Sequence, residues 1–275
     1  MKKLFFLLIF CLFFTGCAPK IPEGSTTVPI LLYHHINEEG DDGSAISVTS
    51  FRRQMELIRT EGYNPISLDA LIDFAEKGTP LPEKPMVITF DDGYYSNYQY
   101  AYPILKEYGY PATIFAIGCS VGHMEFYKDT THTMTPHFGE AEIRVMEESG
   151  LISVQSHTYD MHQWAPFETG DRIRENALPL ENESEADYIA ALTADHLKIS
   201  ALLDKEIQAV AYPHGKSSTL SNQTLQGLGV KVTFTTDGEK VNALLPNQPE
   251  GLIDLGRFSI NETVTDAEFL KYLKK

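Results

Sequence analysis

Cysteine is scarce in this sequence, which has three in 275 residues. Cys11 lies in an N-terminal apolar run, Cys17 follows that run directly, and Cys119 stands alone. Because we expect the first two to be removed or modified on export, no pair remains for an internal disulfide bond. A hydrophobic core must therefore hold the fold, and we expect Cys119 to be a small buried residue at a strand end.

Cationic residues and long apolar runs are also few. The chain has 22 Lys and Arg against 38 Asp and Glu, a net charge of −16, and it shows no basic stripe that could neutralise phosphates. Nucleic acid is therefore excluded as a partner. The apolar run over residues 4–14 is shorter than the about 17–25 residues that a membrane-spanning helix needs.

The N-terminus has the features of an export signal. A basic start, the apolar run and the small residues before Cys17 predict a secretory signal over residues 1–17. Phe14-Thr15-Gly16-Cys17 resembles the lipobox of bacterial lipoproteins, in which the cysteine becomes the lipidated first residue. The resemblance implies an exported bacterial protein, lipid-anchored at the extracellular face of the cell membrane. Plain secretion and an uncleaved anchor are the alternatives.

The rest of the chain divides into a short linker and one domain. Residues 18–27 contain two prolines, a glycine and three hydroxyl side chains, which is typical of a flexible tether. Residues 28–275 show no internal repeat and no second linker, and α/β barrels commonly fill about this length. We predict a single domain over this range and expect a monomer.

Apolar runs alternate with amphipathic stretches throughout this domain, which predicts βαβ units and a parallel sheet. The expected strands are 28–33, 64–66, 86–90, 112–117, 151–154, 209–212, 231–235 and 255–260, and the expected helices are 49–60, 68–76, 97–108, 140–148, 184–203, 223–228 and 266–273. His34, Asp91, Asp92, His157 and His214 follow strands directly. Both parallel barrels and open doubly wound sheets place active sites at strand carboxyl ends, so the pattern predicts a site in either fold.

Asp91 and Asp92 end a predicted strand, and like charges this close are unfavourable unless a cation holds one of them. His157 and His162 follow another predicted strand. A helix would turn them about 140° apart, so they can share a metal only in a loop or single turn. One carboxylate and two imidazoles leave coordination positions open, as catalytic zinc requires, and the same set can bind iron. The second carboxylate is left to do chemistry.

Three motifs combine these residues, and a fourth stretch follows the first strand. The motifs are Thr89-Phe90-Asp91-Asp92-Gly93, Ser156-His157-Thr158-Tyr159-Asp160-Met161-His162 and Ala211-Tyr212-Pro213-His214-Gly215. Together they resemble the polysaccharide deacetylases, family four of the carbohydrate esterases. The histidine spacing and Tyr33-His34-His35 look most like the branch that deacetylates poly-β-1,6-N-acetylglucosamine. The resemblance covers about residues 28–260.

The resemblance implies a distorted, incomplete (β/α) barrel with mostly parallel strands, fewer than eight in number. It implies that Asp92, His157 and His162 hold a divalent metal, zinc first, with iron, cobalt and nickel as alternatives. Asp91 would be the general base. The metal would polarise the acetamide carbonyl and lower the pKa of a bound water toward about 7. The backbone N–H of His214 would help to hold the oxyanion.

Two catalytic features of the family are missing, and so is its usual aspartate-tryptophan motif. The family's Arg-x-Pro-Tyr corresponds here to Tyr212-Pro213-His214, so the base-orienting arginine is absent, and Arg257 is a candidate replacement from another strand. No histidine follows His214, so the usual C-terminal general acid is also missing. His34 is our first candidate for the acid, by its match to the Tyr-His of the biofilm branch, with His214 and Asp91 as others.

Three aromatic residues are candidates for substrate contact. Trp164 lies two residues past His162 and could form a wall of a sugar site, and Tyr94 follows the aspartate pair and could stack on a sugar ring. Packing within the fold is the alternative for both. Tyr212, in the third motif, is the remaining candidate.

We therefore expect a metal-dependent hydrolase that removes N-acetyl groups from an extracellular N-acetylglucosamine polymer, with poly-β-1,6-N-acetylglucosamine favoured. A deacetylase of N-acetylglucosamine or N-acetylmuramic acid in peptidoglycan is one alternative. A catalytically weak, carbohydrate-binding pseudoenzyme is another, because an acid and an arginine are missing, although a pure binder would have no need of Asp91. The expected partners are extracellular or cell-wall polysaccharide and, through the lipid anchor, the membrane.

Overall fold

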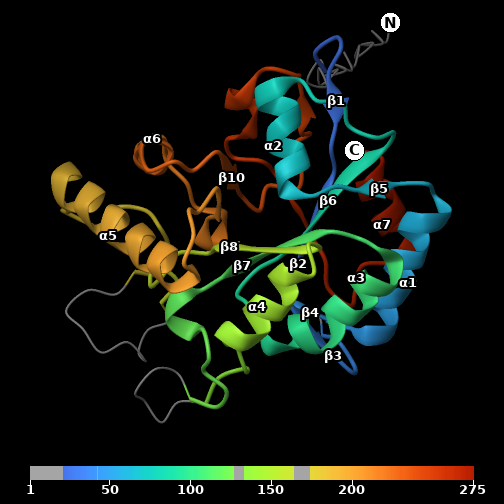
Figure 1. Ribbon diagram of the computed structural model, residues 1–275, viewed down its shortest axis with the longest axis horizontal. Coiled ribbons are helices and arrows are strands. Elements are labelled where there is room, and N and C mark those ends of the chain that lie inside the picture. The colour runs from blue at the N-terminus through green and yellow to red at the C-terminus, as the bar shows by residue number, and fades with distance from the viewer. Residues whose placement is uncertain (1–20, 42, 127–132, 164–173) are drawn as a thin grey trace, which may run out of the picture.

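The computed structural model describes residues 21–41, 43–126, 133–163 and 174–275, whose arrangement Figure 1 shows. The strands are β1 (Thr26–Thr27), β2 (Ile30–Tyr33), β3 (His35–Asn37), β4 (Ala45–Ser47), β5 (Asn64–Pro65), β6 (Pro85–Phe90), β7 (Ala112–Ala116), β8 (Ile152–Ser156), β9 (Ala209–Ala211), β10 (Val232–Phe234), β11 (Ala243–Leu244) and β12 (Phe258–Ser259). The helices are α1 (Val48–Thr60), α2 (Leu68–Lys77), η1 (Asn97–Ala101), α3 (Tyr102–Tyr108), η2 (Gly118–Ser120), α4 (Glu140–Glu148), α5 (Glu185–Leu203), η3 (Pro213–Gly215), α6 (Thr219–Gly227), η4 (Pro249–Leu252) and α7 (Asp266–Leu273).

A parallel sheet organises the fold. Its strands lie in the order β10-β9-β8-β7-β6-β2-β12, with β5 beside β6, and all of these pairs are parallel. The sheet has eight strands, seven along the continuous path and β5 at its side, whereas the resemblance implied fewer than eight. Helices connect the neighbouring parallel strands from β6 to β10, as a parallel sheet requires.

The segment 255–259 contacts both ends of this sheet. Leu255 forms a parallel bridge with Phe234 at the end of β10, and Phe258 of β12 pairs with Leu31 of β2. One short segment therefore links the two edges, which curls the sheet toward a barrel without regular pairing around the whole ring. The predicted distorted, incomplete (β/α) barrel with mostly parallel strands is confirmed.

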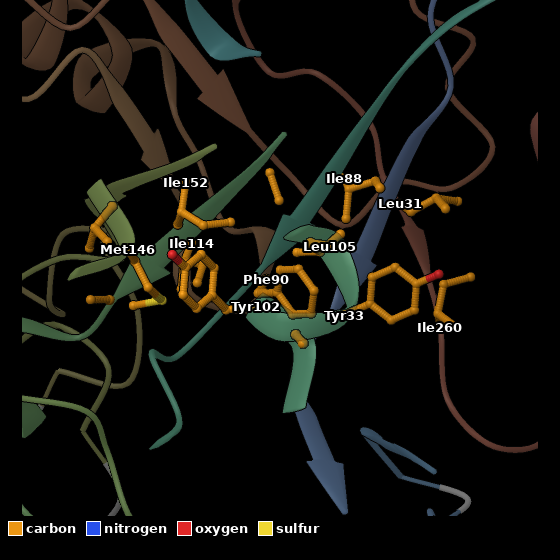
Figure 2. Close-up of a cluster of buried hydrophobic side chains, with 14 of the residues drawn as sticks. Leu31, Tyr33, Ile88, Phe90, Tyr102, Leu105, Ile114, Met146, Ile152 and Ile260 are labelled. Carbon is orange, nitrogen blue, oxygen red and sulfur yellow. The ribbon is translucent and has the colours of Figure 1, made fainter. Parts of the chain in front are cut away.

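Two hydrophobic clusters cover the two faces of the sheet, because successive residues of a strand point to opposite faces. In β6, Phe90 belongs to one cluster and Val87 to the other. Figure 2 shows Phe90 close to Leu105 of α3 in the first cluster. The second cluster contains the inner residues Phe115 and Phe234 and the apolar face of α2. The apolar side chains thus fill the faces of the sheet and leave the strand ends for polar groups.

Serine caps begin two of the helices that cover the sheet. Ser47 accepts a hydrogen bond from the backbone N–H of Ser50 at the start of α1, and Ser67 does the same for Ala70 in α2. Each cap of this kind contributes about 1 kcal/mol. The second helix ends at Gly78, whose φ of 69° lies in the left-handed region that glycine tolerates.

The helix expected over 97–108 differs from the prediction. It begins as the π-helix η1 and becomes α-helical only in α3. The side-chain amide of Asn97 donates to the carbonyl oxygen of His34 at 2.7 Å, so the wide first turn is tied to the end of β2. Isolated π turns are frequent at functional sites.

The N-terminal boundary of the domain also differs. Strand β1 pairs antiparallel with β11, so the last two residues of the range expected as a tether, 26 and 27, belong to a strand. The expected signal over 1–17, with Cys17, lies outside the described residues. Within the residues that are described, no helix combines the length and apolar character needed to cross a bilayer.

Candidate active site

The loops after β6 and β8 bring one carboxylate and two imidazoles together. Oδ1 of Asp92 lies 3.5 Å from Nε2 of His157 and 3.7 Å from Nε2 of His162. All three side chains are almost completely buried, and one ligand atom from each lies within 4.8 Å of the others. These are the three residues that the resemblance suggested as metal ligands, and the two histidines lie outside regular helix, as their spacing required.

The state of these atoms fits a divalent cation. Oδ1 of Asp92 is buried without a hydrogen-bond donor in the described part of the chain, which is costly for a carboxylate oxygen. Nδ1 of His157 lies 2.8 Å from the carbonyl oxygen of Ala211, so it carries the proton and Nε2 presents a lone pair to the cluster. Burial, then the charge of His157, lowers the pKa of His162 to about 4, which keeps its imidazole neutral.

Three residues at the site have an unusual backbone conformation. The φ angles of Asp92, Thr158 and His214 are 72°, 71° and 55°, in the left-handed region. Such conformations cost about 1–3 kcal/mol each and persist where their surroundings hold them, often at functional sites. Here Thr158 donates its N–H to Ser156 Oγ at 3.0 Å, and its own Oγ1 accepts the N–H of Met161 at 3.2 Å. These bonds turn the chain so that both histidine rings face the carboxylate.

The other aspartate has a different partner. Nη1 and Nη2 of Arg257 donate to the two carboxylate oxygens of Asp91 at 2.7 and 2.8 Å, in a fully buried, two-pronged pair. The guanidinium carbon lies 5.7 Å from the ring centres of both Phe115 and Phe234. Burial raises the pKa of Asp91, but the charges of Arg257 and His157 outweigh it and hold the pKa at about 2. The structure thus brings Arg257 to Asp91, as the sequence suggested.

Two further histidines border the cluster. His34 is half-buried at the end of β2. Burial raises the pKa of Asp92, but His34, followed by the two ligand histidines, shifts it downward. The His214 side chain is exposed, and its ring centre lies 4.6 Å from that of His162. Its backbone forms the short turn η3, directly after β9.

The three aromatic candidates for substrate contact are placed differently. Tyr94 is half-buried, and the charge of Asp92, burial and a hydrogen bond to the same carboxylate raise its pKa, so its hydroxyl lies at the cluster. Tyr212 is completely buried and its hydroxyl donates to Asn222 Oδ1 at 2.9 Å. Tyr212 is therefore unavailable to a substrate, because strand alternation turns its side chain into the core. Trp164 lies outside the described residues.

Sequence reasoning missed two buried polar residues near the site. His137 is buried against the Tyr94 ring, with 4.9 Å between ring centres, and burial lowers its pKa to about 4. Asp195, in α5, accepts two backbone N–H groups from the loop between the ligand histidines. Asp195 shares a helix face with Leu192 and Ile199. An acid on the apolar face of a predicted helix is therefore the sequence pattern that could have marked this residue.

Comparison with known proteins agrees with this geometry. The family model described as polysaccharide deacetylase matches residues 78–233, more than half of the chain. YxkH of Bacillus subtilis, itself named for this family, is 28% identical over 257 residues, which is 92% of this chain and 78% of that protein.

Two other matches extend the comparison. The poly-β-1,6-N-acetyl-D-glucosamine N-deacetylase of Escherichia coli K12 is 27% identical over 239 residues, or 77% of this chain, but the match spans only 34% of that longer protein. The structure of a de-N-acetylase from Aggregatibacter actinomycetemcomitans has a TM-score of 0.74 and 23% identity, over 90% of this chain and 100% of that one, which shows a shared fold. With the family model covering the strands that build the cluster, the chain belongs to the polysaccharide deacetylase family.

Proposed function

We propose that this protein is a divalent-metal-dependent deacetylase of an N-acetylglucosamine polymer outside the cell, with poly-β-1,6-N-acetylglucosamine as the favoured substrate. The observation that carries the proposal is the Asp92, His157 and His162 cluster directly beside the paired Asp91 and Arg257. The name of the Escherichia coli relative supports the choice of polymer.

The ligand set would be Asp92, His157 and His162, and zinc is favoured, with iron, cobalt and nickel as alternatives. When bound, the metal would polarise the acetyl carbonyl and acidify a water molecule. Asp91, with a pKa near 2, is a weak base and needs a water that has been acidified in this way. Asp91 is not part of the set and stays ionised, so it can accept the proton of the attacking water. The two-pronged bond from Arg257 fixes the orientation of that carboxylate.

The departing amine needs a proton, and the attacked carbonyl develops negative charge. We assign the proton donor to His34, which follows β2 beside the strand end that carries the two aspartates, with His214 and Asp91 as the alternatives. The backbone N–H of His214 would stabilise the oxyanion, and a single donor of this kind contributes about 3–4 kcal/mol. Tyr94 would border the bound sugar.

Export completes the proposal. The signal over 1–17 and lipidation at Cys17 would anchor a monomeric catalytic domain to the membrane, where it meets polysaccharide outside the cell. The acidic chain offers no attraction to nucleic acid, in keeping with this location.

The test is acetate release by the full-length protein on oligomers of poly-β-1,6-N-acetylglucosamine and, side by side, on peptidoglycan fragments. We expect acetate from the first substrate, loss of activity with a chelator, and recovery with Zn²⁺. Acetate release from peptidoglycan alone would identify peptidoglycan of the cell wall as the substrate instead. Binding of metal and sugar without acetate from either polymer would overturn the proposal in favour of a carbohydrate-binding protein.

A further inference from the structure

A carboxylate from a distant helix holds the loop between the two ligand histidines. Oδ2 of Asp195 accepts the backbone N–H of Tyr159 at 2.7 Å, and Oδ1 accepts the N–H of Asp160 at 2.8 Å. These two amides lie midway between His157 and His162. Helix α5 follows this loop in the chain, so the contact is tertiary and joins segments 35 and 36 residues apart.

Asp195 lies where an apolar residue would be expected. Its side chain is only 6% exposed, on the face of α5 that carries Leu192 and Ile199. An apolar side chain at this position would pack well but would leave two backbone N–H groups without an acceptor, and each such group costs about 1–3 kcal/mol. The two hydrogen bonds to the loop are therefore what accounts for an acid at this otherwise apolar position.

The opposite side of the same loop is also bound. Its carbonyl oxygens at Thr158 and Tyr159 accept the backbone N–H groups of Gly118 and Cys119 at 3.0 and 2.8 Å. Cys119, buried as the sequence suggested, also lies with its Sγ 3.3 Å from Oδ1 of Asp160. The loop is thus held between η2 on one side and Asp195 on the other.

We propose that Asp195 is a positioning residue that sets the separation of the two ligand histidines and so the affinity of the metal site. This inference rests on the proposed function, because it takes His157 and His162 to be metal ligands. It adds to that function a residue of helix α5, which lies outside all three sequence motifs.

The direct test is Asp195→Asn. Both oxygens of the carboxylate are in use, and an amide has only one acceptor, so the variant keeps the shape of the side chain but loses one of the two bonds. Zn²⁺ affinity of the metal-free protein would be measured by competition with a chromophoric chelator. The absorption spectrum with Co²⁺ would report the ligand geometry. We expect Zn²⁺ binding to weaken about 10-fold to 100-fold, with an altered Co²⁺ spectrum.

Glu147→Gln is the matched control. Oε1 of Glu147 accepts the backbone N–H of Val154 at 3.1 Å, in the same strand β8 that leads into the loop, but away from the ligands. Glutamine at this position keeps one oxygen that can accept the Val154 N–H but loses the ion pair with Lys205 Nζ, so the variant should lower thermal stability. We expect its Zn²⁺ affinity to stay within about twofold of the wild type, because β8 is held by its neighbouring strands.

Unchanged Zn²⁺ affinity and an unchanged Co²⁺ spectrum in folded Asp195→Asn would overturn the inference. An equal loss of affinity in both variants would also overturn it, because the effect would then be general.

If Asp195→Asn does not fold, amide exchange in the metal-free wild type decides. Protection of the Tyr159 and Asp160 amides equal to that of β8 supports the inference, and rapid exchange contradicts it. A wild type that binds no Zn²⁺ would instead refute the proposed function, while the exchange measurement still tests the loop.

Discussion

Asp91 and Asp92 are adjacent in the chain, yet they have different partners. Both oxygens of Asp91 are bonded to Arg257, whereas Oδ1 of Asp92 points at the two ligand histidines. Strand geometry sends successive side chains to opposite faces, and the left-handed φ of Asp92 marks where the strand gives way to the turn. Two identical side chains can therefore do different work one peptide apart.

Asp91→Asn should separate chemistry from metal binding. We expect acetate release to fall by about 10²-fold to 10⁴-fold, because the amide cannot accept the proton of the attacking water. Zn²⁺ affinity should change little, because Asp92 and both histidines remain. Asp92→Asn is the complementary variant and should lose Zn²⁺ binding itself. Wild-type acetate release by Asp91→Asn would remove this residue from the reaction.

Asp195 should give the stability of the protein a distinctive pH dependence. Burial raises its pKa to about 6 from 3.8, and Asp160 adds to the rise, while Lys198 and the two loop N–H groups oppose it. The folded pKa exceeds the unfolded one, so only the folded state holds this proton between about pH 4 and 6. The stabilisation is full below about pH 4 and is lost as the pH rises through 6, by about 3 kcal/mol.

The measurement is the free energy of unfolding of the metal-free wild type minus that of Asp195→Asn, from urea titrations between pH 4 and 7. This difference should fall as the pH rises. Because both proteins share every other titrating group, the contributions of those groups cancel in the subtraction. A flat difference would mean that Asp195 titrates in the folded state as it does in the unfolded chain.

Some site residues could be predicted from the sequence because they follow strands in short motifs. Asp92, His157 and His162 are of this kind, and the structure brings them together. Asp195 could not be placed in this way, because nothing local says which loop a helix face will meet. The motif that contains Tyr212 suggests a contact with substrate, but the structure buries this side chain completely.

At the scale of elements, the long periodic segments were the predictable ones. The helices α1, α2, α4, α5 and α7 lie within two residues of their expected ranges. The short strands β1, β3, β4 and β11 were missed, because two or three residues carry no readable period and owe their pairing to tertiary neighbours. The π turn η1 was missed for a similar reason, since its hydrogen bond goes to the end of β2.

The contact between η2 and the ligand loop can be tested at Gly118. A Cβ there would lie 2.5 Å from Cδ2 and 3.1 Å from Cα of Tyr159, so Gly118→Ala must displace the loop. We expect weaker Zn²⁺ binding and a lower thermal midpoint. Gly227→Ala, in α6, is the control: outside its chain neighbours and its own helix backbone, no atom lies within 4 Å of an added Cβ, and alanine should stabilise this helix by about 0.5–1 kcal/mol. Unchanged Zn²⁺ binding in Gly118→Ala would contradict this expectation, because it would show that the loop can shift without moving the ligand histidines.

At the scale of the whole molecule, the extent of the folded body can be tested by truncation. A chain that begins at residue 21 keeps β1, whereas a chain that begins at residue 28 loses the pairing of β1 with β11. The shorter chain should be less stable by about 1–2 kcal/mol, because it lacks the two strand-pairing positions of β1. Urea unfolding of the two chains measures the difference. Equal stability of the two chains would show that β1 is not needed for the fold and that the domain begins at Val28.

The segment that joins the two edges of the sheet also governs the order in which the site can be completed. Arg257 lies between the bridge at Leu255 and the pairing at Phe258, and it stands 166 residues after the carboxylate it neutralises. The carboxylate that follows β6 therefore depends on a counter-charge from a segment much later in the chain. Burial of Asp91 without that segment would leave an anion without compensation, so we expect folding of the barrel and assembly of its chemistry to finish in the same step.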